Sequence, residues 1–345
     1  MNLSIGIVGL PNVGKSTLFK ILTRQEVNIA NYPFATIDPN VGMVSVPDER
    51  LEKLAEISRS KKKIPAIVEF YDIAGLVRGA NKGEGLGNQF LSHIRETQAI
   101  VIVIRLFSNS EIVHVEGTVD PLRDLEIINS ELMLKDLETV EKRLSKLESE
   151  ARSGDKKALK NLAVLKSVRE ELNKGNLLPG FFDEEIVREL QLLAAKKQIY
   201  VLNGTEAEAG KELIEKIKGL SGHYIIADLA ESELSPAEVG LSSAEAGAVP
   251  ELIKKSYEAL GLISFFTTGE DETRAWTIQQ GARAPQAAGA IHSDFENKFI
   301  RAEVINWQKL LEAGSWNQAK QKGLIRLEGK EYETQDGDVM VIRHG

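Results

Sequence analysis

Short apolar runs recur along the first two thirds of the chain, and polar residues or glycines follow each of them closely. The runs are Ile5–Val8, Ile67–Tyr71, Ala99–Ile104, Gln198–Leu202 and Ile225–Ala227. Short, continuously apolar runs of this kind are typical of strands buried on both faces of a parallel sheet. A helical run, Thr17–Leu22, follows the first of them closely. We therefore expect an α/β fold with a doubly wound, mostly parallel sheet.

Between Asp124 and Asn173 the pattern becomes helical, rich in Leu, Glu and Lys and without proline. Apolar residues three and four positions apart form one seam, at Leu137, Val140, Leu144, Leu147 and Ala151. Ser153-Gly154-Asp155 interrupts it, and a second seam continues to Leu172. This spacing predicts an antiparallel α-helical hairpin inserted between two core strands, with arms about 35 Å long at ~1.5 Å per residue.

The last part of the chain reads differently again. From about Ile263 it predicts short strands and one helix, Pro285–Ile291, and it ends in a turn at Asp336-Gly337-Asp338 and a strand, Val339–Ile342. We therefore predict three domains. They are a core of residues 1–123 and 183–261, a helical insertion of residues 124–182, and a tail of residues 262–345.

Composition narrows the class of protein. The 345 residues are long enough for two or three domains, and the net charge is −8. The chain has no cysteine, which excludes disulfides and fits a reducing compartment. No run is long enough to span a membrane, so we expect a cytoplasmic protein. The acidic balance argues against a general nucleic-acid coat, but residues 142–174 hold ten basic and five acidic residues.

The clearest chemistry follows the first strand. Residues 9–17, GLPNVGKST, fit the phosphate-loop pattern G-x-x-x-x-G-K-[ST], between a strand and a helix as that motif requires. In such a loop the backbone N–H groups cradle phosphates and the lysine reaches the β- and γ-phosphates. The chain is thus expected to have a P-loop NTPase core. The predicted nucleotide-binding residues here are Asn12, Val13, Gly14, Lys15, Ser16 and Thr17.

A second motif supports the first. The strand beginning at Ile67 ends in D-x-x-G, which places Asp72 where it would hold a metal through water and the Gly75 N–H where it would contact the γ-phosphate. Thr36, in a proline-containing loop between the motifs, is the candidate metal-sensing threonine; an ordinary loop residue is the alternative. We expect Mg²⁺ as the cofactor, held by Ser16, Thr36 and Asp72.

Three segments resemble one family. Residues 79–91, GANKGEGLGNQFL, are similar to the second switch of the Obg-related NTPases. NYPFATIDPNVG at 31–42 and RAWTIQQGARAPQAAGAIHSDFENKFIRAEVI at 274–305 narrow the resemblance to the YchF-type, or Obg-like ATPase, family, over nearly the whole chain. The resemblance implies a C-terminal β-grasp (TGS) domain that docks to RNA or to a protein partner. The tail has ten basic and twelve acidic residues, so its charge does not indicate RNA binding.

The sequence offers several candidates for the residue that positions the attacking water. Ras-like GTPases place a glutamine after the D-x-x-G glycine, whereas this chain has Leu76, which cannot hydrogen-bond to water. The candidates are His93, Gln89 and His114. The last follows the strand Ala99–Ile104, and the family resemblance implies a histidine here, so we favour it. The alternative is a histidine that only orders the loop. The predicted catalytic set is His114, Lys15 and Gly75.

The base-reading motif departs from that of GTPases. Guanine is read by N-K-x-D, but after the strand Gln198–Leu202 this chain has Asn203-Gly204-Thr205-Glu206, without the lysine and with a longer acid. A site that cannot use the aspartate pair of hydrogen bonds loses its main penalty against adenine. The family resemblance implies the same preference, for ATP over GTP, although the family often has a larger residue in place of Gly204. The predicted base contacts are Asn203, Gly204 and Glu206. The loop after Ile225–Ala227 stands where the last base-contacting loop is expected, but it matches the usual S-A-K motif poorly.

Taken together, these features favour a nucleotide-dependent ATPase switch that acts as a monomer and reports to the ribosome or to ribosomal RNA. The basic arm is either a docking surface for RNA phosphates or an ordinary solvated helix face. Asn12 either helps bind K⁺ beside the phosphates or stabilises the loop. The rival functions are a GTP-specific ribosome-assembly GTPase and a docking module in which turnover is incidental. A metabolite kinase is disfavoured because no arginine-rich lid is evident.

Overall fold

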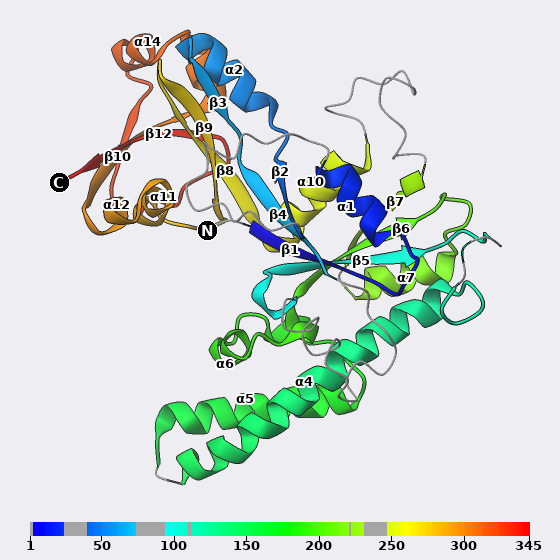
Figure 1. Cartoon of the computed structure of the whole chain (residues 1–345). Coiled ribbons are helices and arrows are strands. Elements are labelled where there is room, and N and C mark those ends of the chain that lie inside the picture. The colour runs from blue at the N-terminus through cyan, green and yellow to red at the C-terminus, as the bar shows by residue number, and fades with distance from the viewer. Residues whose placement is uncertain are drawn as a thin grey trace.

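The structure is a computed structural model that describes residues 3–23, 40–73, 94–109, 112, 114–152, 154–220, 222–230 and 247–345. Within these ranges the chain forms two six-stranded sheets and a helical arm (Figure 1). The described helices include none that combines the length and apolar character needed to cross a bilayer.

The core sheet has the strand order β2-β4-β1-β5-β6-β7. Its strands are β1 (Leu3–Val8), β2 (Val41–Ser45), β4 (Ile67–Asp72), β5 (Ala99–Arg105), β6 (Lys197–Asn203) and β7 (His223–Ala227). All neighbours pair in parallel except β2, which is antiparallel to β4. Every residue of β5 is buried, as expected for a strand covered on both faces. The doubly wound, mostly parallel sheet predicted from the sequence is confirmed.

Helices cover both faces of this sheet. They are α1 (Lys15–Thr23), α7 (Lys211–Gly219), α10 (Ala248–Leu260) and the first turns of α4 (Pro121–Ala151). Figure 1 shows α1 and α10 on one side and α7 and α4 on the other. Leu125, Ile128 and Leu132 of α4 belong to the same buried cluster as the strands. The arm is therefore rooted in the core through its own first helix.

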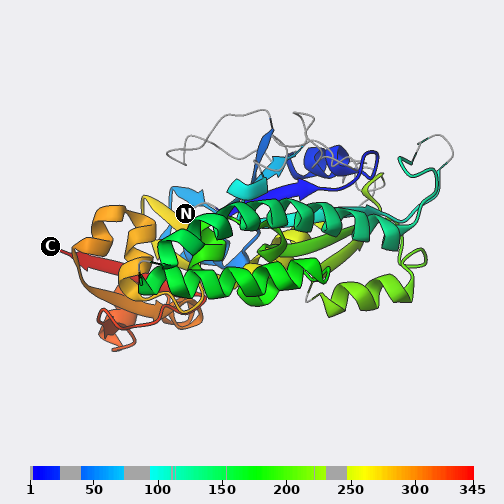
Figure 2. The ribbon, with the colours of Figure 1, turned by 90° about the horizontal axis from the view of Figure 1, so that it is seen from below.

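The predicted helical hairpin is present, formed by α4 and α5 (Lys156–Asn173) (Figure 2). Val140, Leu144 and Leu147 of the predicted seam are buried against α5. The helix α4 begins at Pro121, slightly earlier than expected, because the Asp120 side chain accepts a hydrogen bond from the Arg123 N–H as its N-cap.

The buried core of the arm continues beyond the hairpin. It includes side chains next to or within η3 (Pro179–Phe181), α6 (Glu185–Glu189) and η4 (Leu193–Ala195). The carboxylate of Asp136 on α4 is fully buried and accepts hydrogen bonds from Leu193 N at 2.9 Å and Ala194 N at 2.7 Å. The helical unit thus packs as one piece up to Ala195, beyond the boundary at 182 that we expected.

The tail sheet has the order β11-β10-β12-β8-β9-β3. Its strands are β3 (Lys62–Ile64), β8 (Leu262–Thr268), β9 (Glu272–Gln279), β10 (Phe299–Asn306), β11 (Arg326–Glu328) and β12 (Asp338–His344). The helices are α11 (Ala284–Ile291), α12 (Ser293–Asn297), α13 (Trp307–Ala313) and α14 (Trp316–Gln321). The expectation of one helix was wrong: α11 is present, and three shorter helices accompany it. Those three are too short to show a helical apolar period.

A segment from the first part of the chain completes the tail. Strand β3 pairs in parallel with β9, and Leu51 and Leu54 of α2 (Glu49–Ser58) pack with Phe266 of β8. Figure 1 shows α2 and β3 beside the tail strands, although β2, which precedes them in the chain, and β4, which follows them, lie in the core sheet. The connection between two adjacent core strands therefore passes through the tail.

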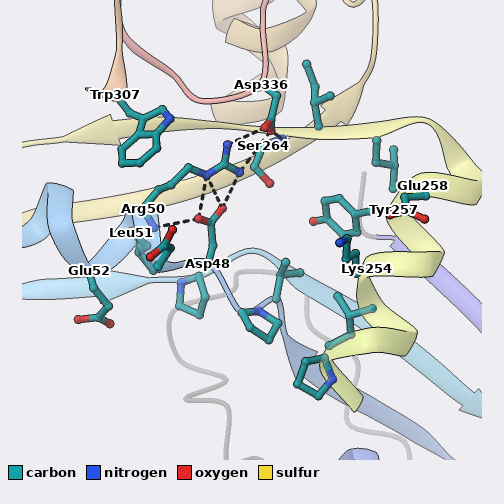
Figure 3. Close-up of a pocket in the computed structure, with 18 of the residues that line it drawn as sticks. Asp48, Arg50, Leu51, Glu52, Lys254, Tyr257, Glu258, Ser264, Trp307 and Asp336 are labelled. Carbon is teal, nitrogen blue, oxygen red and sulfur yellow. Dashed lines mark hydrogen bonds and ion pairs between the residues drawn. The ribbon is translucent and has the colours of Figure 1, made fainter. Parts of the chain in front are cut away.

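Core and tail meet at a cleft of about 1020 Å³ lined by residues of α2, α10 and β8 (Figure 3). The Arg50 guanidinium lies between Asp48 Oδ2 at 2.8 Å and Asp336 Oδ2 at 2.6 Å. Burial opposes its charge, but these two carboxylates outweigh that and raise the pKa of Arg50 above its ordinary value. Asp336 also accepts from Ser264 N at 2.9 Å. This network fastens the start of α2 to the predicted turn before β12.

Candidate nucleotide-binding site

The loop between β1 and α1 has the bend that a phosphate loop needs. Gly14 has φ 104°, and a Cβ there would lie 2.4 Å from Asn203 Nδ2, so only glycine fits. Asn12 also adopts a left-handed backbone, with φ 62°. The first helical bond of α1 runs from Leu18 N to Gly14 O at 2.9 Å. The N-terminus of α1 therefore opens directly from the bend, where its dipole favours anions.

Lys15 is held inside this bend. Its Nζ donates to the Leu10 carbonyl at 2.8 Å, and only 8% of the residue is exposed. Burial lowers the pKa of Lys15 to about 8, against an opposing effect of Asp72. Asp72 ends β4, and burial raises its pKa while Lys15 lowers it. The loop lysine and the carboxylate of the second motif thus interact electrostatically.

A cavity of about 330 Å³ lies over this loop. It is lined by Asn12, Gly14, Lys15, Ser16, Thr17, Phe107, Ile112, Asn203, Leu229 and Ala230. The predicted loop residues are brought together here, except Val13, whose side chain is buried. Sequence reasoning missed Phe107 and Ile112, and it gave Leu229 and Ala230 only a weak assignment. Among the described residues that line the cavity, none carries a carboxylate.

Asn203, at the end of β6, connects three parts of the site. Its Nδ2 donates to the Val13 carbonyl at 2.9 Å, and its Oδ1 accepts from Leu229 N at 3.1 Å. The residue is 4% exposed. The side chain therefore ties the phosphate loop to the loop after β7, in addition to lining the cavity.

The remaining base-reading candidates lie apart from the cavity. Gly204 has φ 150°, and a Cβ there would lie 2.8 Å from Leu106 Cβ, which explains glycine where the family often has a larger residue. Glu206 is exposed and does not line the cavity. Instead Glu208 closes this turn, accepting from Thr205 N at 2.8 Å.

Arg105 is a residue that the sequence analysis did not find. It ends β5, is 1% exposed, and donates to the carbonyls of Phe107, Ile112 and Asn109 at 2.9, 3.1 and 3.3 Å. It also lies 4.4 Å from the Phe107 ring centroid. Arg105 thus holds the carbonyls of a loop that lines the cavity. The signal was available, because a charged residue closing a fully apolar strand needs partners.

His114 lies farther along the same connection and does not line the cavity. Its Nε2 is 2.9 Å from Asp124 Oδ2, and its Nδ1 accepts from Glu116 N at 3.2 Å. Both side chains are buried, 3% exposed for His114 and 1% for Asp124. Burial raises the pKa of Asp124, while His114 and Arg123 act in the opposite direction.

Several predicted residues lie outside the described part of the chain, namely Thr36, Gly75, Leu76, Gln89 and His93. Their roles remain predictions. The donors that are described fit Mg²⁺, since Ser16 lines the cavity, Asp72 interacts electrostatically with Lys15 of the same loop, and both offer the hard oxygen ligands that this ion prefers.

A phosphate loop between the first strand and helix, with an aspartate ending the neighbouring strand, defines a P-loop NTPase. Residues 4–143 match the family described as 50S ribosome-binding GTPase. Residues 262–345 match the YchF-GTPase C-terminal domain, described as a protein of unknown function. The chain belongs to the YchF family, which confirms the resemblance seen in the sequence.

The relatives span the whole chain. The ribosome-binding ATPase YchF of Bacillus subtilis is 47% identical over 99% of both chains. The ribosome-binding ATPase YchF of Escherichia coli O157:H7 is 43% identical over 99% of this chain and 98% of its own. The structure of the Schizosaccharomyces pombe YchF GTPase superposes with a TM-score of 0.83 at 39% identity, covering 99% of this chain and 98% of that one.

Proposed function

We propose that this chain is a Mg²⁺-dependent ATPase that takes GTP less well and signals its nucleotide state to the ribosome. The observation that carries the base preference is the composition of the cavity lining. Guanine offers N1–H and a 2-amino group, which need an acceptor, yet no described lining residue carries a carboxylate. Adenine lacks these donors and meets no such penalty. The relatives named ribosome-binding ATPase agree with this choice.

The predicted site residues, of which Gly75 and Thr36 lie outside the described part of the chain, divide the work in the proposed reaction. Lys15, with the Gly75 N–H, stabilises the γ-phosphate, and the backbone of the loop holds the phosphates. Mg²⁺, held by Ser16 and Thr36 and by Asp72 through water, would neutralise charge on the β- and γ-phosphates. His114 positions the attacking water. We also propose that Asn12 helps bind K⁺, which a comparison of turnover in K⁺ and Na⁺ tests.

The arm supports ribosome docking by its charge. Several exposed basic residues on it form no ion pair within the described part of the chain: Lys142, Lys146, Arg152, Lys156 and Lys166. Neighbouring cations are already neutralised, as Arg143 is by Glu150 and Lys157 by Glu185. The unpaired set provides the charge that contacts with RNA phosphates require. We further propose that the tail docks to RNA or a protein, and that the chain acts in the cytoplasm as a monomer.

Calorimetry with non-hydrolysable ATP and GTP analogues and Mg²⁺ tests the base preference, with Lys15→Ala as the variant that should lose both ligands. Tighter binding of the GTP analogue would favour the ribosome-assembly GTPase instead. Phosphate release with and without purified ribosomes tests the switch. If turnover is negligible with and without ribosomes, and His114→Ala does not change it, the better-supported function is a docking module in which turnover is incidental.

A further inference from the structure

The position of His114 raises a question that the proposed function leaves open. A side chain that orients the attacking water needs a free ring nitrogen near the γ-phosphate. Here the Glu116 N–H occupies Nδ1, and the Asp124 carboxylate occupies Nε2. The two bonds fix one tautomer, in which Nε2 carries the proton and donates a hydrogen bond to Asp124. Neither nitrogen is available to water in this arrangement.

The partner of His114 sits on a firm element. Asp124 lies in the first turn of α4, where the helix dipole stabilises a carboxylate. The start of this helix is fixed by Pro121 and by the Asp120 cap. Arg123 Nη2 contacts the second oxygen of Asp124 at 3.3 Å and also donates to the Thr118 carbonyl. The buried carboxylate is therefore held in place without His114.

The same helix continues into the arm. Helix α4 packs on the core sheet through Leu125 and Ile128, and it runs for 31 residues to its end in the hairpin with α5. Midway along it, the buried Asp136 binds η4, and Arg95 donates to Thr139 at 2.7 Å. One continuous element thus connects the proposed docking surface to the hydrogen-bond partner of His114.

We propose that Asp124 is a positioning residue that holds His114 in a withdrawn state, so that ATP turnover requires this hydrogen bond to break. This inference rests on the proposed role of His114. Because Asp124 belongs to α4, a partner that displaces the arm can release the histidine. The intrinsic rate is set by the small fraction of molecules in which the bond is open. A buried hydrogen bond to a charged acceptor is strong enough to shift such a ratio by about tenfold or more.

The test is intrinsic phosphate release by the full chain at saturating Mg²⁺–ATP. We expect Asp124→Ala to raise kcat about tenfold with KM unchanged, and Asp124→Asn, which keeps an acceptor for Nε2–H, to raise it less. Stimulation by purified ribosomes, measured as a ratio to the intrinsic rate, should fall in the same order. Asp120→Ala is the matched control, since it removes the cap from the same helical turn without touching His114.

A double mutant separates this inference from the proposed function. If Asp124 acts through His114, then Asp124→Ala has no effect on turnover in a His114→Ala background. Loss of kcat in Asp124→Ala would overturn the inference and indicate that the two residues work as a catalytic pair. An increase equal to that of Asp120→Ala would also overturn it, because a loosened helix start would then be the cause. If His114→Ala alone hydrolyses ATP like the parent, the proposed role of His114 fails instead.

Discussion

Replacing Asn203 by alanine tests how the nucleotide site is assembled. The side chain makes two buried hydrogen bonds, to Val13 O at 2.9 Å and from Leu229 N at 3.1 Å. Each contributes about 1 kcal/mol net, and leaving the two backbone groups unpaired brings the total cost to roughly 2–4 kcal/mol. Because both backbone groups belong to loops that surround the cavity, we expect about 2 kcal/mol of this cost to appear in nucleotide affinity, which is roughly 30-fold.

The assay is calorimetric titration of Asn203→Ala with non-hydrolysable ATP and GTP analogues, together with thermal unfolding. If the residue is mainly a tie between loops, both analogues lose affinity by the same factor, and Tm falls by about 5 °C. Asn306→Ala is the control, because it removes a side-chain cap from Gln308 N in the tail and should leave affinity unchanged. Unchanged affinity in Asn203→Ala, or a loss confined to the ATP analogue, would refute the reasoning.

Three further predictions concern buried charges. The Lys15 pKa of about 8 should rise when phosphates bind, so nucleotide binding should take up a proton between pH 8 and 9. Calorimetric titration with nucleotide in two buffers of different ionisation heat should detect this uptake. Lys15→Arg, whose side chain is always charged, should abolish it. Burial raises the pKa of Asp136 to about 6, so the contribution of this group to stability is complete below pH 3.8 and is lost as pH rises through 6. The free energy of unfolding of the parent, measured by denaturant titration, should therefore fall over this window relative to that of Asp136→Asn. A free energy that changes in parallel in the two proteins would contradict the argument. Arg105→Met should destabilise the fold by about 3 kcal/mol and raise the KM for ATP, since three carbonyls lose their donor; an unchanged KM would mean that the loop does not depend on this side chain.

The sequence was informative wherever structure follows from local pattern. The apolar runs predicted the core strands β1, β4, β5, β6 and β7, because strands buried on both faces are mostly apolar, but they did not predict β2, whose residues alternate between half-buried and buried. The three- and four-residue spacing of Val140, Leu144 and Leu147 predicted the arm. Strand β3 could not be found in this way. Lys62 and Lys63 are exposed and only Ile64 is buried, and the strand exists because it pairs with β9, far away in the chain.

The candidate site divides along the same line. The phosphate loop is a contiguous motif, so residue identity alone located Lys15 and the bend before it. The role of Leu229 comes from a contact with Asn203 of β6, and the contact of Asp124 with His114 depends on how the loop between them folds, so no spacing in the sequence reports either. Arg105 gave a partial signal as a charged residue that closes an apolar strand, but its three carbonyl partners depend on the conformation of the loop. Glu206 shows the converse: the motif pointed to it, but the fold leaves it exposed and away from the described cavity lining.

The route of the chain between β2 and β4 decides how this protein can be dissected. A truncation before Leu262 would strip α2 of its partners and uncover Leu51 and Leu54 to water, so it should yield an aggregating fragment rather than a tailless enzyme. The antiparallel register brings Ser45 opposite Ile67. Replacing the segment between those two residues with a short hairpin turn, and truncating the chain before Leu262, should therefore give a catalytic domain that folds on its own.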